Sequence, residues 1–223
     1  MHRAREYYEK EYHYDEDLAV IDEKRIARFF RSVRFITGNR VLDIGCGVGW
    51  ALQYCFQKGL QCVGFDISER AIRLAKSILG DNISALVADG EHLPFASSSF
   101  DIVSSLGTIE HFSSPTRGLG EISSISKEGS QILLVVPNSY WLLNKTKFYT
   151  GTEQPQEMLA TIGQWARLFR RHGLIVQSIG KDIGPRVLKN KHPLGILKRA
   201  VLKITIALPV SLAYQFVFVC RKK

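Results

Sequence analysis

Short apolar runs alternate along the chain with stretches in which apolar residues recur at three- and four-residue steps. The first pattern is typical of buried strands and the second of amphipathic helices, so their alternation predicts βαβ units around a mainly parallel sheet. A chain of 223 residues can bury one substantial core, and we expect a single domain. The seven expected strands are Arg40–Ile44, Gln61–Phe65, Ile83–Ala88, Phe100–Ser105, Gln131–Val136, Leu174–Ile179 and Tyr214–Cys220.

Residues that begin and end helices lie between these runs. Ser68 can accept a hydrogen bond from a free N–H group at a helix start, and Gly80 can adopt the left-handed conformation of a helix end. They predict a helix that continues to Leu79. Apolar spacing predicts two more helices, at 15–34 and at Trp165–Arg171.

A glycine-rich loop follows the first strand, in the run RVLDIGCGVGW at residues 40–50. Glycine lets the backbone approach a ligand closely, and the N-terminus of the next helix favours a carboxylate or a phosphate. A dinucleotide-binding loop has the spacing G-x-G-x-x-G, whereas here the third glycine is Gly49 and residue 50 is Trp. The loop therefore predicts a ligand other than a dinucleotide, and the alternative is a tight turn without a ligand.

With Asp43 before three alternating glycines, the loop resembles the first motif of the class I S-adenosylmethionine-dependent methyltransferases, in the branch similar to the ubiquinone and menaquinone methyltransferases (methyltransferase type 11). The resemblance spans residues 38–180. It implies an α/β fold with a Rossmann-like, seven-stranded, mostly parallel sheet, helices on both faces, an antiparallel last strand, extra N-terminal helices and a helical insertion before the last strand. It also implies that the methionine part of S-adenosylmethionine is held by Asp43, Gly45, Cys46, Gly47 and Gly49.

Two further acids follow the second and third expected strands. Asp66 lies about 20 residues beyond the glycine loop, where α/β nucleotide folds place a carboxylate that binds ribose. One carboxylate can accept hydrogen bonds from both hydroxyls of the diol. The resemblance implies this role for Asp66, with Ile67 packed on the adenine, Asp89 bonded to its amine, and the backbone N–H of Gly90 or Glu91 directed at a ring nitrogen. The alternatives are a helix-start residue at Asp66 and a solvated loop at Asp89.

The segment SLGTIEHF, at 105–112, follows the fourth strand at the carboxyl edge, where ligands sit in open α/β sheets. In similar methyltransferases this segment lies under the sulfonium and faces the acceptor, which implies a cofactor contact for Leu106 and catalytic positions for Glu110 and His111. His111 can take a proton from an acceptor hydroxyl, because an imidazole titrates near working pH. A structural role at a helix start is the alternative. A base is optional, since in-line positioning against an activated sulfonium can supply most of the acceleration.

The same segment argues against methylation of nucleic-acid bases. Enzymes that methylate base amines resemble one another in an Asn/Asp-Pro-Pro-aromatic motif here, and this chain has Ser-Leu-Gly-Thr. Methylation of cytosine C5 needs a nucleophilic cysteine in this region, and the sequence has none between positions 62 and 220. The four cysteines lack the spacing of metal ligands, so we expect reduced thiols and no metal.

The net charge of +9 is concentrated at the C-terminal end. Residues 181–223 hold ten Lys and Arg residues and one acid, whereas the residues before 181 hold 20 of each sign. Within 189–208, apolar residues recur at helical spacing beside Lys198, Arg199 and Lys203, which predicts a cationic amphipathic helix too short and too charged to cross a membrane. Such a helix can lie on an anionic membrane surface, form a homodimer interface or pocket wall, or meet nucleic acid; the last is disfavoured because interleaved aromatics are missing.

The N-terminal segment is charged and aromatic where a signal peptide would need an apolar run, so we expect a cytoplasmic protein, with the inner membrane surface as a peripheral site. Tyr14 in this segment is a candidate to cover the cofactor, and ordinary packing is the alternative. The long connection after the fifth strand is expected to form a lid on the acceptor side.

These observations predict one domain with a helical cap at 1–37, a cofactor-binding core at 38–180, a basic amphipathic insertion at 181–213, and a last strand with a basic tail at 214–223. The predicted function is methyl transfer from S-adenosylmethionine to a small-molecule or lipid-linked acceptor, at oxygen or carbon rather than nitrogen. The alternatives are a non-catalytic cofactor-binding or membrane-associated interaction protein of the same fold, and an RNA methyltransferase.

Overall fold

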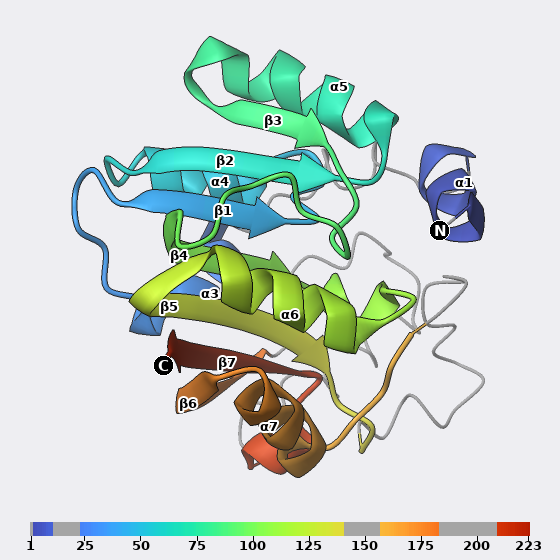
Figure 1. The fold of residues 1–223 in the computed structure, drawn as a ribbon, viewed down its shortest axis with the longest axis vertical. Coiled ribbons are helices and arrows are strands. Elements are labelled where there is room, and N and C mark those ends of the chain that lie inside the picture. Colours follow the sequence, from blue (N-terminus) through green and yellow to red (C-terminus); the bar gives the residue numbers. More distant parts are fainter. Residues whose placement is uncertain (1, 11–22, 141–156, 183–208) are drawn as a thin grey trace, which may run out of the picture.

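The computed structural model describes residues 2–10, 23–140, 157–182 and 209–223. These residues form a seven-stranded sheet in the order β3-β2-β1-β4-β5-β7-β6, in which β7 runs antiparallel to its neighbours β5 and β6 (Figure 1). The expected fold class and all seven expected strands are confirmed. The strands are β1 (Arg40–Ile44), β2 (Gln61–Asp66), β3 (Ser84–Val87), β4 (Phe100–Leu106), β5 (Ser126–Pro137), β6 (Leu174–Asp182) and β7 (Gln215–Lys222).

Two strands, β5 and β6, are longer than their apolar runs predict by more than one residue. β5 begins at Ser126 rather than at residue 131, in a polar stretch where Phe100 pairs with Ser126 and the register then shifts. β6 continues to Asp182, past the expected end of the core at residue 180, because β7 pairs with it as far as Gln215. Pairing with a neighbouring strand thus sets the start of β5 and the end of β6, and a pattern of hydrophobic residues alone does not predict these two boundaries.

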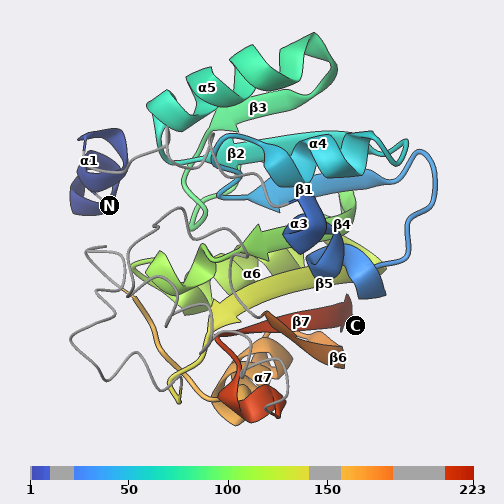
Figure 2. The same cartoon turned by 180° about the vertical axis from the view of Figure 1, so that it is seen from behind.

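Helices cover both faces of the sheet (Figures 1 and 2). One face carries α3 (Glu23–Phe29), α4 (Trp50–Phe56) and α5 (Glu69–Leu79), and their apolar residues pack on the strands in one core cluster. The opposite face carries α6 (Pro115–Ile125) and α7 (Ile162–Arg171), whose Trp165 and Phe169 are fully buried in a second cluster. The sheet is therefore buried on both sides, as expected of a parallel sheet.

The helix boundaries follow their capping residues. Ser68 accepts a hydrogen bond from the backbone N of Ala71 and so caps α5, which ends before Gly80 with its positive φ of 65°. Both predicted ends of this helix are confirmed. α7 begins three residues earlier than expected, because Thr161 and Gln164 form a capping box ahead of the apolar spacing.

The helix predicted at 15–34 is correct only in part. α3 is followed by a 3₁₀ turn at Phe30–Ser32, and Val33 is already extended, so the expected end at residue 34 is wrong by two residues. Residues 15–22 lie outside the described part. Other 3₁₀ turns lie at Gly80–Asn82, Ile109–His111 and Val210–Leu212.

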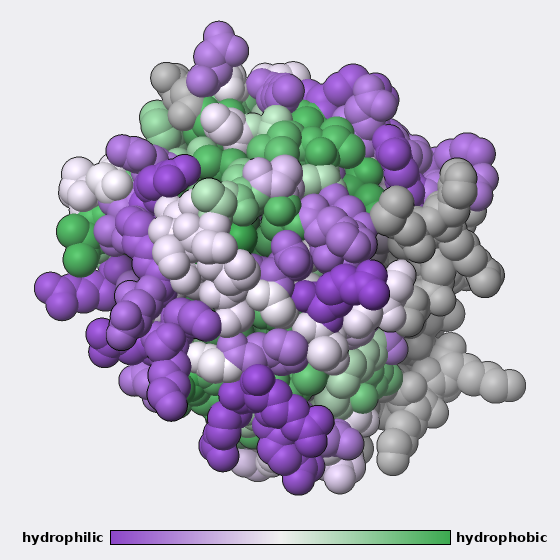
Figure 3. Space-filling model, in the orientation of Figure 1, coloured by the Kyte–Doolittle hydropathy of each residue, from purple (hydrophilic) through white to green (hydrophobic). Residues whose placement is uncertain are grey.

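The helix α1 (His2–Lys10) lies beyond the carboxyl ends of β2 and β3, next to the start of α5, whereas the C-terminus lies at the opposite edge (Figure 1). On the face seen in Figure 3, hydrophobic residues gather mainly over the upper part and hydrophilic residues cover much of the rest. Among the described residues, no helix has the length and apolarity needed to cross a membrane. The expected lid and amphipathic insertion fall largely on 141–156 and 183–208, outside the described residues.

Candidate cofactor and active site

The glycine loop lies at the carboxyl end of β1, beside the end of β4, to which β1 is paired. Its three glycines all have positive φ, of 67° at Gly45, 52° at Gly47 and 91° at Gly49. A β-carbon on Gly45 would collide with Thr108, so packing as well as backbone conformation requires glycine there. One on Gly49 would meet the flexible end of the Leu79 side chain, and its positive φ is the stronger reason for glycine. Among the described residues, no atom lies within 4 Å of a β-carbon placed on Gly47. Gly47 therefore borders open space in which a ligand can approach the backbone.

Asp66 connects this loop to the start of α5. It is the last residue of β2 and is 8% exposed. Its Oδ2 accepts a hydrogen bond of 3.0 Å from the backbone N of Gly47, and its Oδ1 accepts one of 2.9 Å from that of Ser68. Burial raises the pKa of Asp66, and these backbone bonds oppose the shift. Each oxygen can accept a further bond, so the carboxylate is held in place with capacity for hydroxyl donors.

Asp43 is bonded inside the sheet. The hydroxyl of Ser104 donates to its Oδ1 over 2.6 Å, and both residues are buried. Burial raises the pKa of Asp43 to about 7, and the Ser104 bond opposes the shift. Sequence reasoning missed Ser104, because its position opposite Asp43 arises only when β1 pairs with β4. Cys46, also buried, donates its backbone N–H to the carbonyl of Phe65 and so joins the loop to β2.

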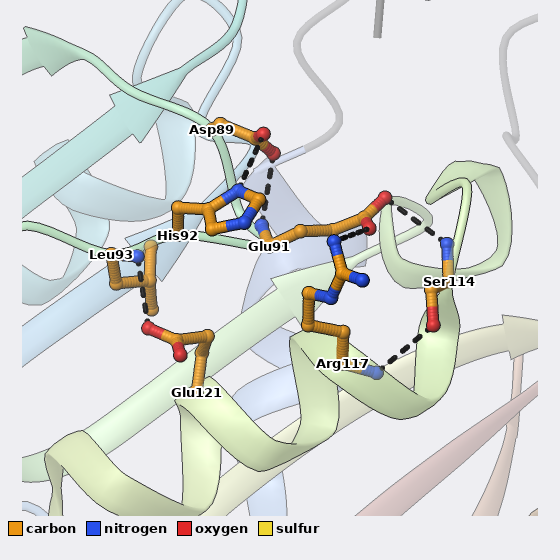
Figure 4. Close-up of polar contacts among 7 residues, drawn as sticks. All are labelled: Asp89, Glu91, His92, Leu93, Ser114, Arg117 and Glu121. Carbon is orange, nitrogen blue, oxygen red and sulfur yellow. Dashed lines mark hydrogen bonds and ion pairs between the residues drawn. The ribbon is translucent and has the colours of Figure 1, made fainter.

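The loop after β3 is shaped by Asp89 (Figure 4). The Oδ1 of Asp89 accepts a hydrogen bond of 2.9 Å from the backbone N of Glu91, and its Oδ2 lies 3.1 Å from Nδ1 of His92. The N–H of Glu91 is thus directed at Asp89. The expectation that a backbone N–H from this loop meets an adenine nitrogen therefore rests on Gly90.

The start of α6 contacts the same loop through hydrogen bonds and an ion pair (Figure 4). The Glu91 carboxylate accepts a bond of 3.1 Å from the backbone N of Ser114 and lies 3.9 Å from the Arg117 guanidinium. The Glu121 carboxylate accepts a bond of 2.9 Å from the backbone N of Leu93. The Glu91 side chain therefore ties the loop to α6, a role that the sequence reasoning did not assign to it.

Glu110 and His111 lie in the 3₁₀ turn after β4, as the sequence places them. Glu110 is 1% exposed, and its Oε2 has no hydrogen-bond partner among the described residues. Burial raises its pKa to about 8, so the carboxyl is mainly neutral at pH 7 and can donate a hydrogen bond. The other oxygen lies 3.9 Å from Nε2 of His111. The two side chains thus form an adjacent acid and imidazole at the carboxyl edge.

A partly buried polar cluster joins parts of the chain that sequence reasoning did not connect. Arg25 in α3 donates to Asp182 at the end of β6 over 2.6 Å, and to Oε1 of Gln215 at the start of β7 over 3.3 Å. A β-carbon on Gly107 would lie 3.6 Å from Oε1 of Glu110 and 3.9 Å from Nε2 of Gln215. The cluster therefore joins α3 to the ends of β6 and β7, and Gly107 lies between Gln215 and the candidate catalytic Glu110.

The structure thus places most of the expected site residues at one edge of the sheet. The carboxyl ends of β1 to β4 share that edge. The glycine loop follows β1, Asp66 ends β2, Asp89 follows β3, and the 105–112 segment begins at the end of β4. Leu106, at the end of β4, packs partly buried against the core on the α3 side. Tyr14 lies outside the described residues.

Comparison with known proteins identifies the family. A family model described as a methyltransferase domain matches residues 11–179, more than half of the chain. This chain belongs to that methyltransferase family. The solved structures similar to this methyltransferase include Haemonchus contortus phosphoethanolamine N-methyltransferase 2 in complex with S-adenosyl-L-methionine, with a TM-score of 0.71 and 20% identity over 98% of this chain and 59% of that one. That similarity shows the fold.

Two curated relatives illustrate the range of the family. The probable chloroplastic tocopherol O-methyltransferase of Oryza sativa subsp. japonica is 34% identical over 101 residues, which are 43% of this methyltransferase and 28% of that protein. The uncharacterized methyltransferase YcgJ of Bacillus subtilis (strain 168) is 26% identical over 151 residues, 64% of this chain and 60% of that protein. The matches span less than two thirds of these relatives. They support the class I assignment, and the finer ubiquinone-methyltransferase-like branch stays a prediction.

The geometry fits the cofactor that the fold implies. S-adenosylmethionine has a charged amino-acid part and a ribose diol, and this methyltransferase offers open space at Gly47 beside the buried, backbone-bonded carboxylate of Asp66. The individual residue roles stay predictions.

Proposed function

We propose that this methyltransferase domain transfers a methyl group from S-adenosylmethionine to a small-molecule or lipid-linked acceptor, at oxygen or carbon in preference to nitrogen. The observation that carries the proposal is the link between Asp66 and Gly47, which joins a buried carboxylate to a glycine that borders open space.

The cofactor-binding roles follow from position along the edge. The β1 loop binds the methionine part through its backbone, Asp66 accepts hydrogen bonds from the ribose hydroxyls, and Asp89 accepts one from the adenine amine. Ile67 packs on the adenine, and Gly90 directs its N–H at the ring. In the β1 loop the residues concerned are Asp43, Gly45, Cys46, Gly47 and Gly49.

Glu110 and His111 act on the acceptor side. The cofactor supplies a methyl group on positively charged sulfur, and the protein holds the acceptor atom in line with it. His111 takes the proton of an acceptor hydroxyl, and the neutral Glu110 donates a hydrogen bond that orients the acceptor. A proton acceptor suits a hydroxyl or an acidic carbon. Similar proteins are named as O-methyltransferases and as N-methyltransferases, so the preference for oxygen or carbon rests on His111.

The place of action that we propose is the cytoplasm, with contact to the inner membrane surface through residues 189–208 or homodimer formation through the same segment. The excess positive charge of that end of the chain supports the first choice.

Calorimetric titration with S-adenosylhomocysteine tests the cofactor site. Loss of the Asp66 carboxylate leaves two ribose hydroxyls without partners, at about 1–3 kcal/mol each, so Asp66→Ala should raise the Kd at least tenfold. Asp81→Ala removes an exposed acid at the far end of α5 and should leave the Kd unchanged. An unaltered Kd in a folded Asp66→Ala protein would refute the ribose assignment.

Transfer of a labelled methyl group tests the acceptor class. The panel consists of a phenol, a polyprenyl quinol, a long-chain fatty acid and a primary amine, each with the label on the methyl group of S-adenosylmethionine. We expect label in the first three classes. Label in the amine alone would contradict the preference for oxygen or carbon, and cofactor binding without transfer to any acceptor would favour a non-catalytic protein.

A further inference from the structure

One side chain of helix α1 binds the first turn of α5. The carboxylate of Glu9 accepts hydrogen bonds from the backbone N of Glu69 and, over 3.2 Å, from that of Arg70. A helix leaves its first four N–H groups without partners inside the helix. Glu9 therefore satisfies two of these donors at the start of α5 from a residue 60 positions away.

The same turn also carries the carboxylate assigned to ribose. Ser68 donates its backbone N–H to Asp66 over 2.9 Å, and its hydroxyl contacts the carbonyl oxygen of Tyr8 in α1 at 3.4 Å. α1 and Asp66 thus hold consecutive residues of one turn. A movement of α1 away from α5 would release the N–H groups of Glu69 and Arg70, three and four residues after Asp66.

Electrostatics favours this attachment. The N-terminus of a helix carries a partial positive charge, which stabilises a carboxylate placed against it. Glu9 is also close enough to Asp66 for its negative charge to contribute to the raised pKa of Asp66. The two carboxylates therefore share the helix start, where their like charges repel each other and the N–H groups of the turn hold both.

We propose that Glu9 is a positioning residue of the cofactor site, which docks α1 on α5 and thereby fixes the turn that carries Asp66. The inference rests on the proposed role of Asp66 in binding ribose. Cofactor binding orders this turn, and α1 docking orders the same turn, so each stabilises the other. Such coupling is reciprocal: if the cofactor favours docked α1, docked α1 strengthens cofactor binding by the same factor.

The affinity and dissociation rate of S-adenosylhomocysteine test the first half of this coupling. Glu9→Gln removes the charge and one of the two acceptor oxygens, and we expect the Kd to rise roughly fivefold, with faster dissociation. Glu6→Gln is the matched control, since it makes the same change in the same helix at a carboxylate that pairs with Lys10 over 2.9 Å. Glu9→Asp retains the charge and should recover part of the affinity.

Limited trypsin digestion tests the second half of the coupling, the effect of the cofactor on α1 docking. A merely structural role of Glu9 would not make this digestion depend on the ligand. Arg5 and Lys10 lie in α1. S-adenosylhomocysteine should slow cleavage at these residues in the wild type and in Glu6→Gln, and should have little effect in Glu9→Gln.

Equal affinity and equal ligand-dependent protection in wild type and Glu9→Gln would overturn the inference. The proposed function fails separately: in that case the wild type does not bind S-adenosylhomocysteine, or Asp66→Ala binds it as tightly as the wild type. If Asp66→Ala weakens binding and Glu9→Gln does not, the cofactor site stands and only the role of Glu9 is wrong.

Discussion

At the scale of single residues, burial decides the protonation of Glu110. Its pKa rises from 4.5 to about 8, so between these values the folded chain holds a proton that the unfolded chain has lost. The stability associated with this group is complete below pH 4.5 and is lost as the pH rises toward 8. A buried carboxyl of this kind suits a hydrogen-bond donor better than a permanent charge.

Glu110→Gln should therefore flatten the dependence of the free energy of unfolding on pH. One titrating group can contribute at most about 1.4 kcal/mol per pH unit, and the variant should lose a large part of that slope. Urea unfolding between about pH 5 and pH 8, the window of the raised pKa, measures the effect. The raised pKa of Asp43 affects both proteins equally. Glu128→Gln, at an exposed glutamate, is the control, and identical slopes in wild type and Glu110→Gln would disprove the prediction.

At the scale of elements, one ion pair joins α3 to the ends of β6 and β7. The Asp182 side chain is fully buried and that of Arg25 is 26% exposed, so removal of the arginine leaves a buried charge without its partner. Breaking a buried pair in this way costs roughly 3–5 kcal/mol. Arg25 also lies over the ring of Phe29, 5.2 Å from its centroid, so part of its contribution is packing.

Arg25→Met keeps most of the aliphatic packing and should lower the free energy of unfolding by about 3 kcal/mol. Arg25→Met combined with Asp182→Asn removes both charges and should recover much of that loss. Urea denaturation of both variants and of Asp182→Asn completes the double-mutant cycle. If the losses of the two single variants simply add, the pair contributes no coupling and the prediction fails.

At the scale of the whole molecule, charge separates the chain into two parts. Residues before 181 carry equal numbers of basic and acidic side chains, and the excess of basic residues falls in 181–223. Cations near an anionic lipid surface gain about 1 kcal/mol each, and salt screens this gain. Lys198, Arg199 and Lys203 lie outside the described residues, so this prediction depends on the sequence alone.

Replacement of those three cations by Gln should reduce binding to anionic vesicles without altering the Kd for S-adenosylhomocysteine. Flotation with anionic and zwitterionic vesicles, at low and high salt, measures the binding to vesicles. The matched control replaces three exposed cations of the core, Lys58, Arg73 and Lys76. If the wild type binds both kinds of vesicle equally, the membrane contact is wrong and the segment is better interpreted as a dimer or pocket element.

Local signals were enough to predict the scaffold and the edge that carries the site. Seven apolar runs predicted seven strands, and Ser68 and Gly80 predicted both ends of α5, because strand burial and helix capping act over a few neighbouring residues. Three alternating glycines after a strand predicted the positive-φ loop. By contrast, the polar start of β5 and the end of the helix at Ser32 depend on packing and were missed.

Tertiary structure alone decided the polar contacts of the site. Three of these contacts join residues that are far apart in the sequence, and no local pattern connects them. The separations are 60 positions for Glu9–Glu69, 61 for Asp43–Ser104 and 157 for Arg25–Asp182. The sequence by itself determined which carboxylates stand at the ends of strands. Only the folded chain determined that Glu110 is buried without a full set of partners, because desolvation is a property of everything packed around a group and not of its neighbours in the chain.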